Sequence, residues 1–354
     1  MTTELSKNAV ELLQQIISIP SFSRDETAVA DFLEHFIESK GYVVSRKENN
    51  IWLTSPGFDV SRTTILLNSH IDTVKPVSGW ERNPFSPVIE KGKLFGLGSN
   101  DAGASVVSLL YAFFHLSQQP QAYNLIFAAT AEEEVSGKNG IESLLKDLPK
   151  IDFVVVGEPT GMQPAVAEKG LMVVDCTAYG HAGHAARNDG DNAIYKALKD
   201  IEWFRNYQFS EISALLGSVK MTVTQINAGT QHNVIPDKCS FVVDIRSNEK
   251  YTNEEILAEI QKQVGCEVQA RSTRLSSSFT SLNHPFVNRA KELNLIPFGS
   301  PTLSDQALIS CQSVKIGPGL SERSHTADEF ILLSEIEESI DMYIKLLNGL
   351  DLKM

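Results

Sequence analysis

The sequence predicts an α/β fold, in which a smaller ferredoxin-like α+β domain is inserted into a larger α/β/α domain with a mostly parallel central sheet. A chain of 354 residues is long for a single hydrophobic core, so two domains are expected. Short apolar segments alternate with helical patterns in the first part of the chain, which is typical of a parallel sheet covered by helices. From about Gly170 the order of elements changes to β-α-β-β-α-β, the order of a ferredoxin-like sandwich.

In the larger domain, residues 1–40 predict two helices that are separated by a turn at Pro20-Ser21, and Gly41 ends the second one. Residues 104–116, ASVVSLLYAFFHL, are apolar almost all round, as in a helix that is buried against a sheet. The predicted strands of this part are Tyr42–Ser45, Ile51–Thr54, Thr64–Asn68, Asn124–Ala129 and Phe153–Gly157, with a helical stretch near Gly140–Asp147.

The smaller domain is predicted at residues 170–275, between the two parts of the larger domain at 1–169 and 276–354. Its predicted elements are a strand at 171–180, a helix at Asn192–Tyr207, strands at Ser218–Asn227 and Cys239–Arg246, a helix at Asn253–Val264 and a strand at Cys266–Ser272. The segments Pro285–Asn294, Asp305–Ser310 and Leu333–Leu347 then restore the α/β pattern.

Composition excludes several classes of protein. The net charge of −13 argues against a nucleic-acid partner, because phosphate binding needs a basic face. No stretch is long and apolar enough to span a bilayer, and the first residues lack the pattern of a secretion signal, so we expect no membrane partner and a cytoplasmic location. The four cysteines are scattered, with neither a CxxC pair nor a disulfide-dense pattern, as in a reducing compartment.

A set of carboxylates and imidazoles occurs in short contexts that are typical of metal ligands. The strings are LLNSHIDT at His70, GSNDAGAS at Asp101, ATAEEEVSG at Glu133 and Glu134, VVGEPT at Glu158 and ERSHTADEF at His325. Three of these strings lie just beyond the carboxyl end of a predicted strand, which is the edge where sites assemble in open α/β sheets. Such a set can hold one or two divalent cations and activate water near neutral pH.

The local spacing of two motifs suggests separate roles. His70 and Asp72 lie two residues apart on extended backbone, so both side chains point to the same side, and a carboxylate there can fix the tautomer of a metal-bound imidazole. Of the adjacent Glu133 and Glu134, one can bind metal while its neighbour transfers a proton. Each motif alone also has an ordinary explanation: a surface histidine, a helix-capping aspartate or a solvated run of charges.

One alternative site is a dinucleotide-binding loop at GLGSNDAG, residues 96–103. Its glycines lack the GxGxxG spacing directly after a strand, so this interpretation is not favoured.

Taken in order, the motifs resemble the co-catalytic zinc aminoacylases and carboxypeptidases of peptidase family M20, in particular the branch of acetylornithine deacetylase and succinyl-diaminopimelate desuccinylase. The resemblance covers essentially the whole chain, and the smaller domain falls between the fourth and fifth metal motifs. The chain departs from the family at residues 101–104, Asp-Ala-Gly-Ala, where many relatives have Asp-Met-Lys-Gly. It also keeps Ser304-Asp305 in PTLSDQAL without the glycines that often precede that pair.

The resemblance implies two zinc ions, with cobalt or manganese as substitutes. The implied ligands are His70 and Glu158 for one ion, Glu134 and His325 for the other, and Asp101 for both. Asp72 would orient His70, and Glu133 would be the general base.

For the substrate, the resemblance implies contacts from Asn233 in HNVIPD, Arg246 in VVDIR and Ser304. His184 in YGHAGHAA matches the family's oxyanion-binding histidine better than His181, and it would act in the site of a partner subunit in a homodimer formed through the inserted domain. Arginine suits a carboxylate because its planar fork gives two parallel hydrogen bonds.

The implied function is hydrolysis of the amide bond of an N-acylated amino acid, by attack of a zinc-bridging hydroxide. The first choice of substrate is an N-acetyl- or N-succinyl-ornithine, or the citrulline analogue, of arginine biosynthesis. The alternatives are a succinyl-diaminopimelate desuccinylase or a di- or tripeptidase on the same scaffold. A non-catalytic binding protein derived from such a hydrolase is a third hypothesis, although these proteins generally lose a ligand or the base, and neither is missing here.

Overall fold

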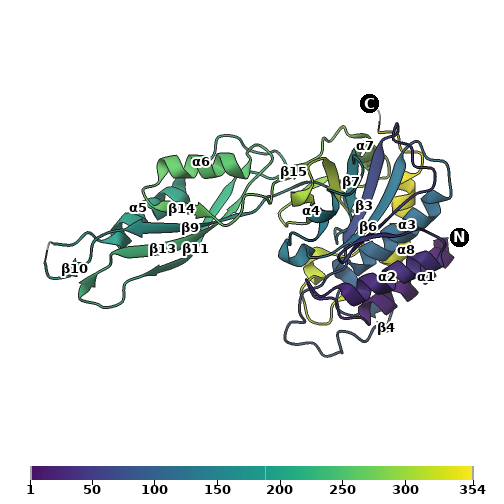
Figure 1. The fold of residues 1–354 in the computed structure, drawn as a ribbon, viewed down its shortest axis with the longest axis horizontal. Helices are drawn as coiled ribbons and strands as arrows, with labels where there is room; N and C mark the ends of the chain where they lie inside the picture. The colour runs from purple at the N-terminus through teal and green to yellow at the C-terminus, as the bar shows by residue number, and fades with distance from the viewer. Residues whose placement is uncertain (1, 188, 353–354) are drawn as a thin grey trace. The chain divides into compact units, whose positions relative to one another are not determined.

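The computed structural model describes residues 2–187 and 189–352, and the chain divides into two compact units (Figure 1). Unit 1 consists of Met1–Val166, Phe279–Phe298 and Ser304–Met354. Unit 2 consists of Ala167–Ser278 and Gly299–Leu303. In the part of the chain that the structure describes, no helix has the length and apolar character needed to cross a bilayer.

Unit 1 is built around a sheet whose central strands run parallel in the order β6-β3-β7-β17. The bounds of these strands are β3 Thr64–His70, β6 Asn124–Thr130, β7 Phe153–Val156 and β17 Gln312–Lys315. Every residue of β3, β6 and β7 is buried, as their nearly continuous apolar runs require in a sheet covered on both faces. The predicted α/β class with a largely parallel central sheet is confirmed.

Further strands extend this sheet on both sides. Beyond β6 lie β2 (Asn50–Thr54) and β1 (Ser45–Lys47), both in antiparallel pairing. Beyond β17 lies β8 (Ala165–Glu168), antiparallel to it, and β15 (Ser278–Phe279) and β16 (Phe298–Ser300) pair with β8.

Helices cover both faces of the parallel strands (Figure 1). On one face α3 (Ala104–Ser117) packs against β3 and β6 and against α1 (Thr2–Ile17) and α8 (Leu333–Leu347). On the other face α4 (Ile141–Leu144) joins a cluster with Leu66, Ile126 and Val154. The predicted all-round apolar helix at 104–116 is confirmed, because α3 is buried almost throughout. The remaining helices of unit 1 are α2 (Thr27–Ser39) and α7 (Pro285–Glu292).

One predicted strand differs from the structure. The sequence predicts a strand at Tyr42–Ser45, but the strand β1 begins only at Ser45, and Val43 before it is 86% exposed. The segment Asp305–Ser310 is a 3₁₀ turn, η3 (Asp305–Leu308). A small antiparallel sheet of β4 (Val88–Glu90), β5 (Lys93–Phe95) and β18 (Phe330–Leu332) was not predicted.

Unit 2 contains a four-stranded antiparallel sheet in the order β11-β13-β9-β14. In chain order its elements are β9 (Met172–Tyr179), α5 (Ala193–Asn206), β11 (Lys220–Ala228), β13 (Lys238–Arg246), α6 (Asn253–Gln263) and β14 (Glu267–Ala270). This is the predicted β-α-β-β-α-β order. A separate two-stranded ribbon pairs β10 (Gly183–His184) with β12 (Val234–Ile235).

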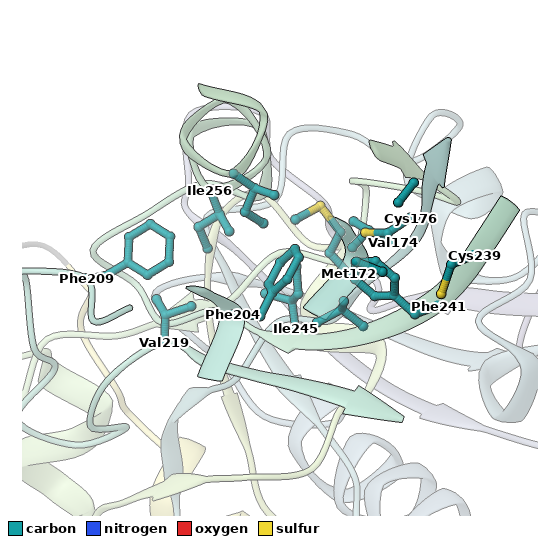
Figure 2. Close-up of a cluster of buried hydrophobic side chains, with 14 of the residues drawn as sticks. Met172, Val174, Cys176, Phe204, Phe209, Val219, Cys239, Phe241, Ile245 and Ile256 are labelled. Carbon is teal, nitrogen blue, oxygen red and sulfur yellow. The ribbon is translucent and has the colours of Figure 1, made fainter. Parts of the chain in front are cut away.

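The core of unit 2 lies between this sheet and its helices (Figure 2). Burial alternates along β9 and β13, so that every second side chain points to the helices, as the period of two in a strand requires. Phe204 of α5 and Ile256 of α6 complete the cluster. Cys176 and Cys239 pack within it as free, buried thiols.

Candidate metal centre

The residues expected to bind metal lie at the carboxyl edge of the parallel strands of unit 1. His70 is the last residue of β3, and Glu158 follows β7. Glu134 lies in η2 (Glu133–Val135), the 3₁₀ turn after β6. Asp101 lies in η1 (Ser99–Gly103), directly before α3, and His325 follows η4 (Ser321–Arg323) in the loop after β17. Because carboxyl ends of parallel strands share one edge, residues far apart in the sequence meet there.

These five side chains form two groups that share Asp101, and within each group the ligand-type atoms lie within 4.8 Å of one another. In the first group, Nε2 of His70 is 3.2 Å from Oδ1 of Asp101 and 3.7 Å from Oε1 of Glu158. In the second, Nε2 of His325 is 3.0 Å from Oε2 of Glu134 and 3.7 Å from Oδ2 of Asp101. The two oxygens of Asp101 therefore face different groups, as a carboxylate that bridges two cations must do.

The chemistry of these residues fits a pair of divalent cations. Imidazole nitrogens and carboxylate oxygens are ordinary ligands of zinc. Oε1 of Glu158 is buried and has no hydrogen-bond partner, which is costly for a carboxylate that no cation neutralises. Burial raises the pKa of Glu158 well above its usual value, and the nearby Asp101 carboxylate adds to this although His70 opposes it. The hydrogen bond to Glu134 raises the pKa of His325 to about 9.

Asp72 holds the imidazole of His70 from the side opposite to the other ligands. Nδ1 of His70 lies 2.9 Å from the carbonyl oxygen of Asp72 and 3.5 Å from its Oδ1. Because both of these oxygens are acceptors, they favour the tautomer with the proton on Nδ1, which leaves the lone pair of Nε2 for a cation. The main-chain amides of Glu133 and Glu134 donate to the two carboxylate oxygens of Asp72 at 3.0 and 3.1 Å, which ties η2 to the end of β3.

Glu133 is the acid whose surroundings suit proton transfer. Burial raises its pKa well above the usual value; the charge of His70 opposes this, and the charges of Glu158, Asp305 and Glu134 reinforce it. A carboxylate with a raised pKa accepts protons more readily near neutral pH.

Glu132, the first acid of the run, is not solvated. It is 7% exposed, and its carboxylate accepts hydrogen bonds from the side chain and the main-chain amide of Asn139. A Cβ at Gly137 would lie 1.8 Å from Oε2 of Glu132, so only glycine fits beside this folded turn.

Three buried residues around the site were not assigned a role from the sequence. Glu329 accepts main-chain hydrogen bonds from the turn that carries Asp101. The side chain of Asn100 accepts a hydrogen bond from the amide of Leu320, in the loop that carries His325. Asp305 accepts hydrogen bonds from Asn68 at 2.7 Å and Thr130 at 3.0 Å, and burial raises its pKa to about 6. Asp305 and Glu329 stood in the strings PTLSDQAL and ERSHTADEF, but nothing in those strings shows what their side chains contact.

The structure places the four remaining residues as follows. Ser304 is buried in unit 1, where its hydroxyl caps η3 by accepting from the amide of Gln306. In unit 2, His184 lies in β10 beside Asn233, whose carbonyl accepts from the amide of Ala185. Arg246 ends β13. The substrate contacts of all four stay predictions.

The guanidinium of Arg246 donates two hydrogen bonds to the carboxylate of Asp244, at 2.8 and 3.1 Å. The planar fork of this arginine is thus already placed to bind a carboxylate through both nitrogens.

Solved structures with the same fold cover nearly the whole chain. Aminopeptidase PepT from Bacillus cereus is 18% identical, with a TM-score of 0.76 over 97% of this chain and 98% of that one. A tripeptidase from Staphylococcus aureus is 19% identical, with a TM-score of 0.74 over 97% of both chains. The YXEP protein from Bacillus subtilis, described as a dinuclear metal-binding peptidase of family M20, is 16% identical, with a TM-score of 0.73 over 98% of both chains.

The sequence itself decides the family. The model of peptidase family M20/M25/M40 matches residues 66–349, which include every residue of the two ligand groups. The chain therefore belongs to peptidase family M20/M25/M40, a family of metal-dependent hydrolases.

Proposed function

We propose that this protein is a two-metal, cytoplasmic hydrolase that cleaves one amide bond of a di- or tripeptide. The observation that carries the proposal is the pair of ligand groups that share Asp101, with the half-buried Glu133 directly before the ligand Glu134. The choice of short peptides is supported by the aminopeptidase and the tripeptidase whose folds this chain shares. It was the alternative in the sequence-based hypothesis, and the comparisons favour it over an N-acyl amino acid.

When bound, two zinc ions would polarise the amide carbonyl and make a water molecule acidic enough to lose a proton near neutral pH. His70 and Glu158 would hold one ion, Glu134 and His325 the other, and Asp101 both. Glu133 would accept the proton of the attacking water and later deliver it to the leaving nitrogen. One proton is thus taken and returned, and a carboxylate and an amine are released.

Residues of unit 2 would complete the site. We propose that His184 stabilises the negative charge on the carbonyl oxygen in the site of a second subunit, and that unit 2 forms the homodimer interface. Asn233 directly precedes β12, the strand that pairs with β10 of His184, and would contact the substrate beside that histidine. A monomer with full activity would contradict this part of the proposal.

A second candidate substrate is an N-acetyl- or N-succinyl-amino acid, such as acyl-ornithine, acyl-citrulline or succinyl-diaminopimelate. Arg246 supports it, since its guanidinium already binds a carboxylate, that of Asp244, through two nitrogens. A substrate carboxylate would have to replace Asp244 there.

A kinetic panel separates these substrates. The purified protein is assayed with added zinc, cobalt or manganese on di- and tripeptides, acetyl- and succinyl-ornithine, acyl-citrulline and succinyl-diaminopimelate. The proposal expects the highest kcat/KM for a peptide. A higher value for an acyl-amino acid would favour the second candidate, and a protein that binds none of the three metals would favour a non-catalytic binding role.

Glu133→Gln tests the general base. It should bind metal like the wild type and lower kcat by about a hundred- to ten-thousand-fold, because only proton transfer is lost. Glu132→Gln is the matched control, since Glu132 is the neighbouring acid but its carboxylate contacts Asn139. Its kcat should stay within a few-fold of the wild type. Substantial turnover by Glu133→Gln would remove Glu133 from the mechanism.

A further inference from the structure

We propose that Glu329 is the positioning residue of the metal centre, and that its carboxylate fixes the turn Gly98–Asp101 so that the two oxygens of Asp101 face the two ligand groups. The inference rests on the metal centre proposed above. It adds a residue that belongs to neither ligand group and acts through the main-chain amide of Asp101.

Three main-chain amides of this turn converge on one carboxylate. Oε1 of Glu329 accepts from the amides of Asn100 at 2.8 Å and Asp101 at 2.9 Å, and Oε2 accepts from the amide of Gly98 at 3.0 Å. Consecutive amides that point inward from a turn form a concave site for an anion, and here that anion belongs to the protein. Glu329 is only 2% exposed, so water does not compete for these bonds.

The turn needs a side chain for this purpose because its own backbone does not supply the acceptors. Asp101 has φ −122° and ψ 97°, which is extended and not helical. Gly98 has φ +73°, and a Cβ there would lie 2.6 Å from Cγ2 of Thr73. The crowded turn thus passes through conformations that leave its amides without helical partners, and Glu329 accepts from them instead.

The backbone of Glu329 is held independently of its carboxylate. Its carbonyl accepts from the amide of Gly96 at 3.0 Å, and β18, which follows it, pairs with β5. The side chain is therefore not needed to place its own strand, and its three bonds act on the turn of Asp101.

Asn100 makes the complementary connection. Its Oδ1 accepts from the amide of Leu320 at 3.0 Å, and its Nδ2 donates to the carbonyl of Leu320 at 3.1 Å and to the hydroxyl of Ser324 at 3.3 Å. The residue before Asp101 thus fixes the loop of His325, while Glu329, which follows His325, fixes the turn of Asp101. The turn that carries Asp101 and the loop that carries His325 therefore fix each other's position through these hydrogen bonds.

The test compares Glu329→Gln with a matched control. Glutamine of the same shape turns its NH₂ group toward one of the donating amides, so one bond is replaced by a repulsive contact. The control is Asp152→Asn, since Oδ2 of Asp152 accepts from the amide of Thr64 at 2.9 Å, at the end of β3 opposite to His70. Each variant replaces a carboxylate that accepts main-chain hydrogen bonds, from three amides at Glu329 and from one at Asp152, with a carboxamide.

The measurement is the affinity of the metal-free protein for zinc, determined in competition with a chromophoric chelator, together with the absorption spectrum of the cobalt-loaded protein. We expect Glu329→Gln to weaken both zinc-binding steps by about ten- to a hundred-fold, because Asp101 belongs to both groups. Its cobalt spectrum should also change. Asp152→Asn should lower the unfolding temperature only.

Wild-type zinc affinity and cobalt spectrum in Glu329→Gln would overturn the inference, whereas a wild-type protein that binds no zinc would overturn the proposed metal centre itself. If Glu329→Gln does not fold, Glu329→Asp carries the test, because it keeps the charge but withdraws the carboxylate by one methylene. Wild-type affinity in Glu329→Asp would show that charge alone is sufficient and would also overturn the positioning role.

Discussion

At the scale of single residues, Asp72 contacts three other residues of the site: His70, Glu133 and Glu134. It is fully buried, and its carboxylate accepts from the hydroxyl of Ser23 as well as from the amides of Glu133 and Glu134. Burial alone would raise the pKa of Asp72, but the hydrogen bonds from His70 and its other donors hold it below the usual value. The residue stays ionised and fixes both the ring of His70 and the turn after β6.

Asp72→Asn should therefore lower metal affinity and kcat/KM by about ten- to a hundred-fold. In the wild type every donor around this side chain faces a carboxylate oxygen, whereas in the variant one of them would face the NH₂ group of asparagine. Zinc titration and steady-state kinetics measure this. Ser23→Ala is the control: it removes one hydrogen bond to Asp72, worth about 1 kcal/mol, and leaves the carboxylate in place. Equal effects of the two substitutions on zinc affinity would show that Asp72 has no special role in orienting His70.

Among the elements, the loop after β17 connects the segments that carry Glu158 and His325. The amide of Gly317 donates to the hydroxyl of Thr160 at 3.1 Å, and the amide of Met162 donates to the carbonyl of Gly317 at 2.9 Å. A Cβ at Gly317 would lie 2.5 Å from the carbonyl oxygen of Glu158 and 2.4 Å from the hydroxyl oxygen of Ser105. This close approach is possible only for glycine.

Gly317→Ala should destabilise unit 1 by about 1–3 kcal/mol, because the added methyl group overlaps main-chain atoms that cannot move without displacing Glu158. Activity should fall with it, and denaturant unfolding and kinetics measure the two effects. Gly265→Ala is the matched control, because a Cβ there meets only Oδ1 of Asp200 at 3.8 Å. A Gly317→Ala protein with wild-type stability would contradict the close packing of this loop.

At the scale of the whole molecule, each unit has a core of its own. Unit 2 buries the cluster of β9, β13, α5 and α6 (Figure 2). The residues of the two ligand groups all belong to unit 1. Metal binding should therefore stabilise unit 1 alone, since a ligand stabilises only the part of the chain whose folded form binds it.

Removal of metal with a chelator should lower the unfolding temperature of unit 1 and leave that of unit 2 unchanged. At a free zinc concentration a hundred times the dissociation constant, the expected stabilisation is about 2.7 kcal/mol per site. Differential scanning calorimetry with and without chelator measures the two transitions, and added zinc should restore the first. Equal shifts of both transitions would show that the units unfold together.

The sequence by itself determined the class of fold and the chemical types in the site. Buried parallel strands must be apolar along their whole length, so the runs before His70, Glu133 and Glu158 were visible as strands, and their shared edge followed from the α/β order. The β-α-β-β-α-β order after Gly170 likewise predicted the ferredoxin-like arrangement of unit 2.

Only the tertiary structure decided how these side chains are held. Glu329 and Asp305 are charged residues whose partners are main-chain amides or polar side chains distant in the sequence, and no local pattern encodes such contacts. Glu132 directly precedes Glu133 in the sequence, yet its carboxylate accepts a hydrogen bond from the side chain of Asn139. Propensity and periodicity describe neighbours along the chain, whereas the orientation of a buried carboxylate depends on which donors the folded chain brings to it.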